Sequence, residues 1–360
     1  MPAASAGGIS KKGREMARGI YGSWTTLDLE SEGKRFGVLN VPMSTTRSAY
    51  GNLQVPLAVI AKGSGPTVLL MAGNHGDEYE GQVSLSRVVR ELQPDDLNGR
   101  VIVMPAANLP AVLDAARVSP VDGGNLNSSF PGRVDGGPTA QIAHFVESEL
   151  LPKCVAWLDL HSGGSSLEYL PMAAIHQSED AALDKRALEA LAAFGAPTSV
   201  VFRFQHEYAA SSAAQRRDVV YIYGEFGGGG TVNPVGVRIT YEGVLRALAH
   251  FKILRDLGRF KVGPAQRSNR LFDTSVGDTY VATRRNYAFA PVRGVFECFV
   301  PLGEWVEAGQ PMGCVHHVEE PGREPSVVSF PMAGMLLAKR HAARVEGGDC
   351  LGQLALPRAG

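Results

Sequence analysis

Short apolar runs alternate with amphipathic stretches between residues 68 and 257, and this alternation restricts the fold more than any other feature of the chain. The apolar runs have the length of buried strands, and they are residues 68–72, 101–104, 155–160, 199–202 and 219–223. Helical periodicity predicts helices over 79–92, 139–150, 181–194 and 234–257, the last with Asn233 as its N-cap. This order is typical of an α/β domain whose mostly parallel or mixed sheet carries helices on both faces.

The pattern changes after about Gly263, where short strands separated by glycine replace helical periodicity. Strands are expected over 290–296, 302–309 and 330–335, which together indicate a small β domain. Its glycine pattern resembles lipoyl and biotinyl barrels, but no lysine stands at the hairpin tip, so its expected role is shape or assembly. His316 and His317 follow each other on an expected strand and therefore face opposite ways, so we interpret them as surface residues.

Charge and cysteine content point to an ordinary intracellular protein. A formal net charge of −1 and a pI of about 6.8 give no electrostatic reason to expect nucleic acid or a membrane surface as a partner. The four cysteines lack C-x-x-C spacing, so neither a disulfide framework nor a cysteine zinc site is expected; they are Cys154, Cys298, Cys314 and Cys350. The first 19 residues lack the apolar core of a signal peptide, and no stretch is apolar for long enough to span a bilayer. The expected location is the cytoplasm.

Two strand ends carry residues that suit a metal ion. His75 and Glu78 follow the first apolar run with a spacing that lets an imidazole and a carboxylate reach one cation, although such a pair is also common on protein surfaces. His161 ends the run 155–160, and the carboxyl ends of strands are where ligands gather in open α/β sheets. Two histidines and one carboxylate would leave a coordination position open for water, the pattern of a catalytic zinc site. Asp159 would orient His161 if this strand stays regular.

Four short motifs occur along the chain: Gly73-Asn74-His75-Gly76-Asp77-Glu78, Asn125-Leu126-Asn127 followed by Phe130-Pro131-Gly132, Asp159-Leu160-His161-Ser162-Gly163-Gly164 and Gly224-Glu225-Phe226-Gly227-Gly228. With these motifs, in this order, the chain resembles the succinylglutamate desuccinylase/aspartoacylase family, which is related to zinc carboxypeptidases. Within the family, the run from Asn74 to Gly81 is most similar to the branch of N-alpha-acetyl-L-2,4-diaminobutyrate deacetylases.

The resemblance implies a zinc-carboxypeptidase-like mixed sheet flanked by helices, with one Zn²⁺ per chain. Glu225 matches the family's catalytic glutamate, which takes a proton from the attacking water. Arg117 matches an arginine whose guanidinium faces the developing oxyanion, and Asn127 matches an asparagine that orients the substrate by hydrogen bonding.

These expectations divide the chain into three parts. Residues 1–20 are expected to form a flexible N-terminus. Residues 21–262 are expected to form the zinc-dependent catalytic α/β domain, with a β-rich part up to about residue 60. Residues 263–360 are expected to form the C-terminal β-barrel-like domain.

The sequence departs from the family at Ser128, where an arginine normally follows Asn127 and holds the substrate carboxylate. A hydroxyl cannot neutralise a carboxylate, so part of that affinity should be lost. Three explanations stay open: another cation substitutes, the substrate has no free carboxylate there, or the protein hydrolyses poorly. We favour a changed substrate because the three metal ligands and Glu225 are retained. The candidate substitutes are Arg133, Arg203, Arg216 and Arg217.

The sequence therefore predicts a zinc-dependent amidohydrolase that removes a short acyl group, acetyl in the first place, from the nitrogen of a small amino-acid-like compound. The alternatives are a carboxypeptidase-like peptidase and a non-catalytic zinc- or ligand-binding protein. Its expected partner is a small-molecule N-acyl substrate, and the sequence leaves a homo-oligomer open without setting the oligomeric state.

Overall fold

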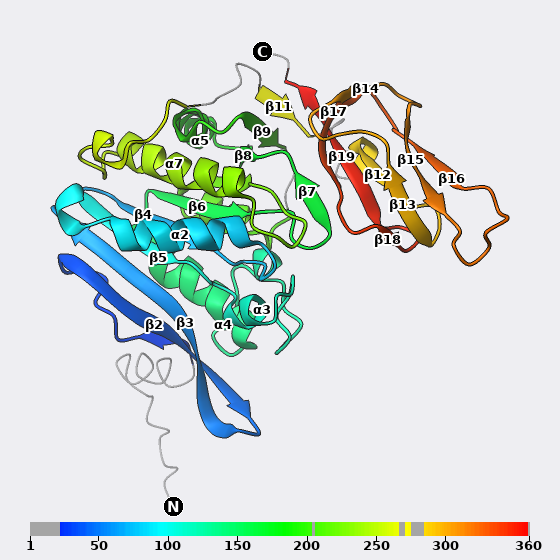
Figure 1. The fold of residues 1–360 in the computed structure, drawn as a ribbon. Coiled ribbons are helices and arrows are strands. Elements are labelled where there is room, and N and C mark those ends of the chain that lie inside the picture. The colour runs from blue at the N-terminus through cyan, green and yellow to red at the C-terminus, as the bar shows by residue number, and fades with distance from the viewer. Residues whose placement is uncertain (1–21, 204–205, 266–270, 275–283, 359–360) are drawn as a thin grey trace, which may run out of the picture.

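A long mixed sheet with helices on both faces forms the centre of the molecule (Figure 1). The computed structural model describes residues 22–203, 206–265, 271–274 and 284–358, so the expected flexible N-terminus lies outside the described residues. The strand order is β1 (Trp24–Thr25), β2 (Gly33–Thr45), β3 (Ser48–Lys62), β5 (Gly99–Met104), β4 (Thr67–Ala72), β6 (Ala156–His161), β10 (Val220–Glu225), β8 (Met172–His176), β9 (Thr198–Phe202), β11 (Leu271–Asp273), β19 (Cys350–Pro357), β17 (Gly334–Arg340) and β14 (Trp305–Val306). The predicted α/β fold with a mixed sheet is confirmed.

The strands at the middle of the sheet are parallel to one another. β5, β4, β6 and β10 are joined by parallel pairing, while β3 and β8 run antiparallel to their neighbours in this group. Every residue of β4 and β6 is buried, because helices cover both faces and each apolar side chain finds a layer to pack against. Parallel pairing brings the carboxyl ends of β4, β6 and β10 to one edge of the sheet.

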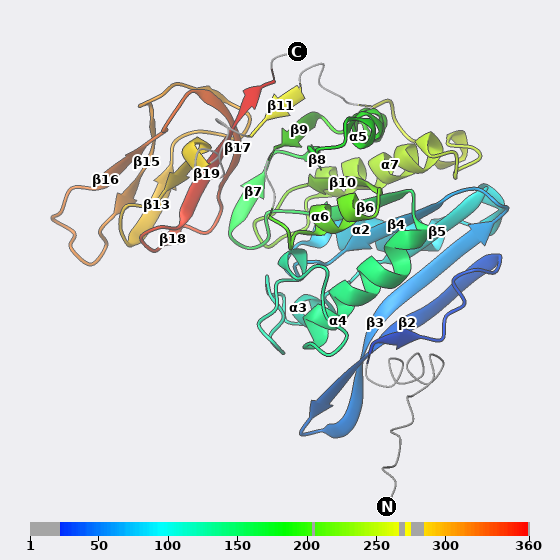
Figure 2. The same ribbon diagram turned by 180° about the vertical axis from the view of Figure 1, so that it is seen from behind.

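Three helices cover one face: α2 (Tyr79–Glu91), α5 (Ala181–Phe194) and α7 (Pro234–His250). On the other face lie α4 (Pro138–Phe145) and α6 (Ala210–Arg216), as the view from behind shows (Figure 2), and α3 (Leu109–Leu113) lies near α4. Side chains along β4 point alternately to the two faces of the sheet. Leu70 packs in the core layer under α2, α5 and α7, and Leu69 packs in the layer under α4 and α6. No helix within the described ranges is long and apolar enough to cross a membrane.

One helix prediction was wrong at its carboxyl end. The last helix was expected to reach residue 257, but α7 ends at His250, and Lys252 takes a positive φ of 60°. That turn places Ile253 and Leu254 in the core, where burying them outweighs continuing the helix. The helix expected over 139–150 is α4 followed by a π-helical turn, Val146–Leu150.

After β11, the C-terminal region forms a second, smaller sheet. Its order is β16 (Ser326–Ser329), β15 (Pro311–His316), β13 (Gly294–Cys298) and β18 (Arg344–Val345). The expected C-terminal strands exist but are displaced, since β13 begins at Gly294 rather than at residue 290, and β17 begins at Gly334. The main sheet also continues into this region, because β11 pairs with β9 on one side and with β19 on the other. The domain boundaries given above stay predictions.

Two short strands complete the junction between the two regions. β12 (Tyr287–Phe289) pairs with β19, and β7 (Leu167–Tyr169) pairs with β17.

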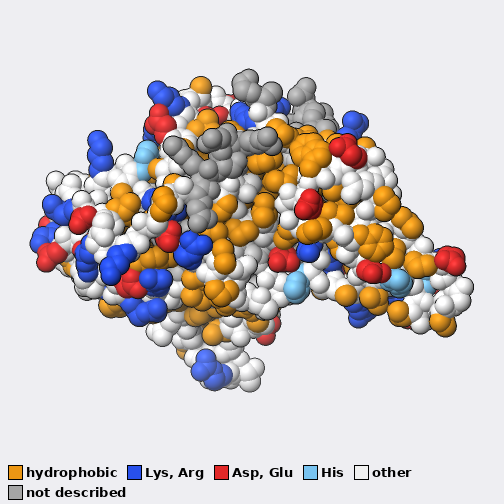
Figure 3. Space-filling view, turned by 45° about the horizontal axis from the view of Figure 1, so that its top comes forward, with side chains coloured by type: hydrophobic (Ala, Val, Ile, Leu, Met, Phe, Trp, Pro, Cys, Tyr) orange, Lys and Arg blue, Asp and Glu red, His pale blue; other side chains and the backbone are white. Residues whose placement is uncertain are grey.

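Figure 3 shows acidic and basic side chains interleaved over the end of the molecule where α2 and α7 terminate, so that part of the visible surface carries charge of both signs.

Candidate active site

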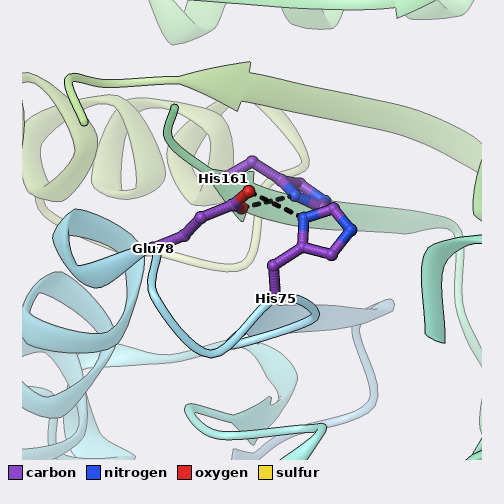
Figure 4. Close-up of side chains that lie close together, drawn as sticks. All are labelled: His75, Glu78 and His161. Carbon is purple, nitrogen blue, oxygen red and sulfur yellow. Dashed lines mark hydrogen bonds and ion pairs between the residues drawn. The ribbon is translucent and has the colours of Figure 1, made fainter. Parts of the chain in front are cut away.

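His75, Glu78 and His161 meet at the edge of the sheet formed by the carboxyl ends of β4 and β6 (Figure 4). His161 is the last residue of β6, His75 lies in the turn after β4, and Glu78 is the N-cap residue of α2. Two glycines permit this approach. A Cβ on Gly76 would lie 1.9 Å from the Ala111 carbonyl oxygen, and a Cβ on Gly81 would lie 2.5 Å from the Leu160 carbonyl oxygen. The sequence prediction that these three side chains converge agrees with this geometry.

The three side chains form a compact, buried cluster. His75 Nδ1 lies 2.7 Å from Glu78 Oε1, and His161 Nδ1 lies 2.8 Å from Glu78 Oε2. One ligand atom from each residue lies within 4.8 Å of the others, and all three side chains are at most 4% exposed. The Glu78 carboxylate is stabilised by both imidazoles, which hold its pKa well below the usual range against the opposing effect of burial.

The outer nitrogens of both imidazoles have acceptors. His161 Nε2 lies 3.1 Å from Asp159 Oδ2, and His75 Nε2 lies 3.1 Å from Asn125 Oδ1. In the tautomer whose Nε2–H donates outward, each Nδ1 has a lone pair beside an oxygen of Glu78, so these four atoms could together serve a cation placed between them. The donor set therefore fits a metal ion held by His75, Glu78 and His161.

Asp159 is fixed by more than its contact with His161. Its Oδ2 accepts hydrogen bonds from the Tyr221 hydroxyl at 2.8 Å and from Asn74 Nδ2 at 3.0 Å, and the residue is fully buried. Strand alternation along β6 points Asp159 and His161 to the same side, as expected for a regular strand. The role of Asn125 was missed, although it stands two residues before Asn127 in the same motif.

Glu225 ends β10 directly beside His161, because these two residues are partners in the parallel pairing of β10 with β6. The side chain is half-buried, and its Oε2 has no hydrogen-bond partner among the described residues. Burial, reinforced by the nearby Glu78 charge, raises the pKa of Glu225 well above its usual value. A carboxyl group with a raised pKa and an unused oxygen is suited to proton transfer.

A cavity of about 470 Å³ opens in front of this cluster. Arg117, Asn127 and Glu225 line it together with the cluster of two histidines and one glutamate. Arg117 Nη1 lies 3.5 Å from Glu78 Oε1, and its side chain is 57% exposed, so the guanidinium reaches the cluster from the open side. The volume is in the range of small-molecule sites.

Aromatic side chains form the inner wall of this cavity: Tyr169, His176, Phe202, Tyr221 and Tyr223. His176 and Tyr223 stack with their ring centroids 5.2 Å apart. Burial raises the pKa of the Tyr221 and Tyr223 hydroxyls well above 10, which keeps them protonated as hydrogen-bond donors.

A larger cavity, of about 790 Å³, lies elsewhere, beside Trp24 and Phe145. The one histidine in its lining is His144, and the distance from His144 Nδ1 to Ser148 Oγ on the same helical segment is 3.4 Å. The described lining brings no set of metal ligands together, and its Glu30 and Lys153 side chains pair with each other at 2.8 Å. We therefore place the candidate active site in the smaller cavity, where the titratable groups converge.

Ser128 lies at the rim rather than in the cavity lining. It belongs to the short turn Leu126–Ser128, is exposed, and its Oγ lies 3.3 Å from His206 Nε2. His206 does line the cavity. The described part of the segment after Arg203 contains α6, which packs alanine side chains against β10.

The four arginines proposed as substitutes for the family's arginine are engaged elsewhere. Arg133 pairs with Asp135 at 3.1 Å, Arg203 with Asp273 at 2.7 Å, and Arg216 with Glu147 at 2.8 Å, while Arg217 lies 3.9 Å from Glu147. Among the described residues, none of these four arginines lines the cavity. Arg117 is the one lysine or arginine in the described lining.

The C-terminal region supports one wall of the site. β7 follows the His161 loop and pairs with β17, and the Tyr169 hydroxyl donates to Gln353 Oε1 at 3.4 Å. On the loop after Glu225, the space where Gly229 would carry a Cβ is filled by the His341 imidazole, 2.7 Å away. Sequence reasoning left the function of this region at shape or assembly, because no local pattern connects strands so far apart in the chain.

Comparison with known proteins agrees with this fold and site. The profile described as "Succinylglutamate desuccinylase/Aspartoacylase catalytic domain" matches residues 64–251. The chain is 37% identical over 331 residues to the N-alpha-acetyl-L-2,4-diaminobutyric acid deacetylase of Halomonas elongata, covering 92% of this chain and 94% of that protein.

Solved structures give the same result. The product-bound ectoine utilization protein EutE (DoeB) of Ruegeria pomeroyi superimposes with a TM-score of 0.85 at 33% identity, covering 93% of this chain and 98% of that one. The succinylglutamate desuccinylase/aspartoacylase structure from Rhodobacter sphaeroides gives 0.84 at 34% identity, with coverage of 93% and 99%.

Fold and site together define an α/β enzyme that hydrolyses amide bonds and carries a His-Glu-His cluster able to bind a metal ion. The chain belongs to the succinylglutamate desuccinylase/aspartoacylase family.

Proposed function

We propose that this enzyme is a zinc-dependent deacylase that removes a short acyl group, acetyl in the first place, from the nitrogen of an amino-acid-like compound. The observation that carries the proposal is the convergence of His75, Glu78, His161 and Glu225 on one small cavity. The deacetylase of Halomonas elongata, which matches nearly the whole chain, supports the acetyl group and the amino-acid-like amine.

His75, Glu78 and His161 would hold the metal ion, and the two-histidine, one-carboxylate set is typical of catalytic zinc. When bound, such an ion supplies Lewis acidity, which polarises the scissile carbonyl and lowers the pKa of coordinated water.

Glu225 acts as the general base and then the general acid. It takes a proton from the attacking water and returns it to the leaving nitrogen, for which its raised pKa suits it at neutral pH. Arg117 faces the same space from the open side and donates hydrogen bonds to the oxyanion that develops on the carbonyl oxygen. Asn127 orients the substrate from the cavity wall.

Substrate recognition differs from the family pattern at Ser128. A serine at the rim, bonded to a histidine, replaces an arginine, and the four candidate arginines already pair with carboxylates. We therefore propose that binding depends less on a free carboxylate at this position than in the arginine-containing members of the family.

A combined metal and substrate experiment tests the proposal. Metal content is measured together with amine release from a panel of N-acyl amino acids, their amides and short peptides. We expect release from N-acetyl compounds, loss after chelation and recovery with Zn²⁺. Release from peptides alone would favour the peptidase alternative, and binding without turnover would favour a non-catalytic binding protein. If stable protein that contains zinc released no amine from any compound of the panel, the proposed deacylase activity would be wrong.

A further inference from the structure

Glu297, Cys314 and His316 meet on the four-stranded C-terminal sheet, outside the candidate active site. His316 Nε2 lies 2.8 Å from Glu297 Oε2 and 3.4 Å from Cys314 Sγ, and Cys314 Sγ lies 3.8 Å from Glu297 Oε2. The cluster belongs to β13 and β15, which Figures 1 and 2 both place on the far side of β17 and β19 from the catalytic strands.

The backbone itself brings the three donors together. β13 and β15 are antiparallel, and Glu297 is the direct partner of Cys314 across the two strands. Directly opposed residues project to the same face of a sheet, and His316 joins them because it lies two residues after Cys314 on the same strand. His316 is 41% exposed, in line with its interpretation as a surface residue, but it shares its face of β15 with Cys314.

The separations match those of one coordination sphere. Zinc bonds of about 2.3 Å to sulfur and about 2.0–2.2 Å to nitrogen and oxygen, at tetrahedral angles, place donor atoms roughly 3.3–3.6 Å apart. Of the three observed separations, 3.4 Å falls within this range, while 2.8 Å is shorter and 3.8 Å is longer. Rotations of the exposed Glu297 and His316 side chains are enough to close the difference, since these are 59% and 41% exposed.

We propose that Glu297, Cys314 and His316 form a second metal site, which binds a borderline divalent cation such as Zn²⁺ and leaves one position to solvent. Thiolate and imidazole ligands select zinc over magnesium or calcium, which prefer oxygen donors. The buried sulfur supplies the inner ligand and the two more exposed side chains close over it from the solvent side. A bound ion would connect β13 to β15 without touching the catalytic strands. The competing interpretation is a surface ion pair between His316 and Glu297.

Cobalt substitution distinguishes the two sites, because a thiolate ligand adds a sulfur-to-cobalt charge-transfer band that the His-Glu-His cluster cannot give. The full-length protein is stripped of metal and titrated with Zn²⁺ or Co²⁺, with stoichiometry measured by elemental analysis. We expect two ions per chain and a sulfur-to-cobalt band in the wild type. Cys314→Ala should bind one ion, lose the band and retain deacylase activity, whereas His161→Ala should bind one ion and keep the band.

Two further variants complete the test. Cys298→Ala is the matched control, because Cys298 follows Glu297 on β13 and alternation turns it to the opposite face. Its band should equal that of the wild type. Glu297→Gln changes an exposed side chain without threatening the fold and should weaken binding at this site. One ion per chain in the wild type, or a band that survives Cys314→Ala, would overturn the proposal and leave an ion pair only.

Discussion

Glu225 and His161 are register partners at the last paired position of two parallel strands, β10 and β6. This pairing fixes the distance between the proposed base and one proposed metal ligand through backbone hydrogen bonds rather than through flexible loops. The same edge receives His75 from the turn after β4, which pairs with the other side of β6. The chemistry therefore depends on the relative positions of three neighbouring strand ends.

Replacing Glu225 by glutamine should abolish proton transfer while preserving shape. We expect kcat to fall by about 10²- to 10⁴-fold, the usual contribution of general acid-base catalysis, with metal content unchanged. Kinetics and elemental analysis on the same preparation check this. Glu168→Gln is the control, since Glu168 lies nearby on β7 but outside the cavity lining. Wild-type turnover in Glu225→Gln would rule out the proposed base.

Replacing Asp159 by asparagine should weaken metal binding. The carboxylate orients His161 and is itself held by Tyr221 and Asn74, so an amide would disturb the imidazole tautomer. The expected loss of metal affinity is about 10- to 100-fold, measured by competition with a chelator. Tyr221→Phe removes one support of Asp159 and should cost less. Equal metal affinity in Asp159→Asn and the wild type would show that Asp159 does not act through His161.

The first turn of α2 approaches β6 so closely that Gly81 leaves no room for a side chain. A Cβ there would lie 2.5 Å from the Leu160 carbonyl oxygen, and rigid backbone cannot yield as a side-chain tip can. Gly81→Ala should therefore move α2 away from the sheet and increase the distance between Glu78 and His161. We expect destabilisation of about 1–3 kcal/mol in chemical denaturation, with reduced metal content. A variant with unchanged stability and full metal content would contradict this close-packing argument.

Much of the site could be predicted because its residues stand in short motifs at strand ends. His75, Glu78 and His161 each follow an apolar run, and period and spacing are local properties of sequence, while the role of Glu225 came from the resemblance to the family's catalytic glutamate. The wall built by Tyr169 and Gln353 could not be predicted in this way, because it depends on β7 meeting β17 and β19 across long separations. The end of α7 was mispredicted for a related reason. Burying Ile253 in the core stabilises the fold more than continuing the helix would, and local periodicity does not report this burial.

Cys154 should be chemically inert. Burial raises the pKa of its thiol to about 12, and its Sγ donates to the Leu150 carbonyl oxygen at 3.2 Å. At pH 8 about one molecule in 10⁴ would carry the reactive thiolate, and this fraction rises tenfold with each pH unit up to the pKa. Alkylation followed by mass spectrometry should modify the half-buried Cys298 and Cys350 well before Cys154. Rapid labelling of Cys154 in folded protein would contradict its burial.

Restoring an arginine at position 128 should change which substrates bind. The added guanidinium would lie at the cavity rim beside His206, where it can form a charge-assisted pair with a carboxylate. Such a pair contributes about 1.5–3 kcal/mol, so Ser128→Arg should raise kcat/KM for free-acid substrates over their amides by roughly 10- to 100-fold. Ser128→Ala is the matched control, because it removes the hydroxyl without adding charge and should leave the ratio near that of the wild type. An unchanged ratio in Ser128→Arg, with the protein folded and metal-loaded, would mean that position 128 does not face the carboxylate and that selectivity is set deeper in the aromatic wall.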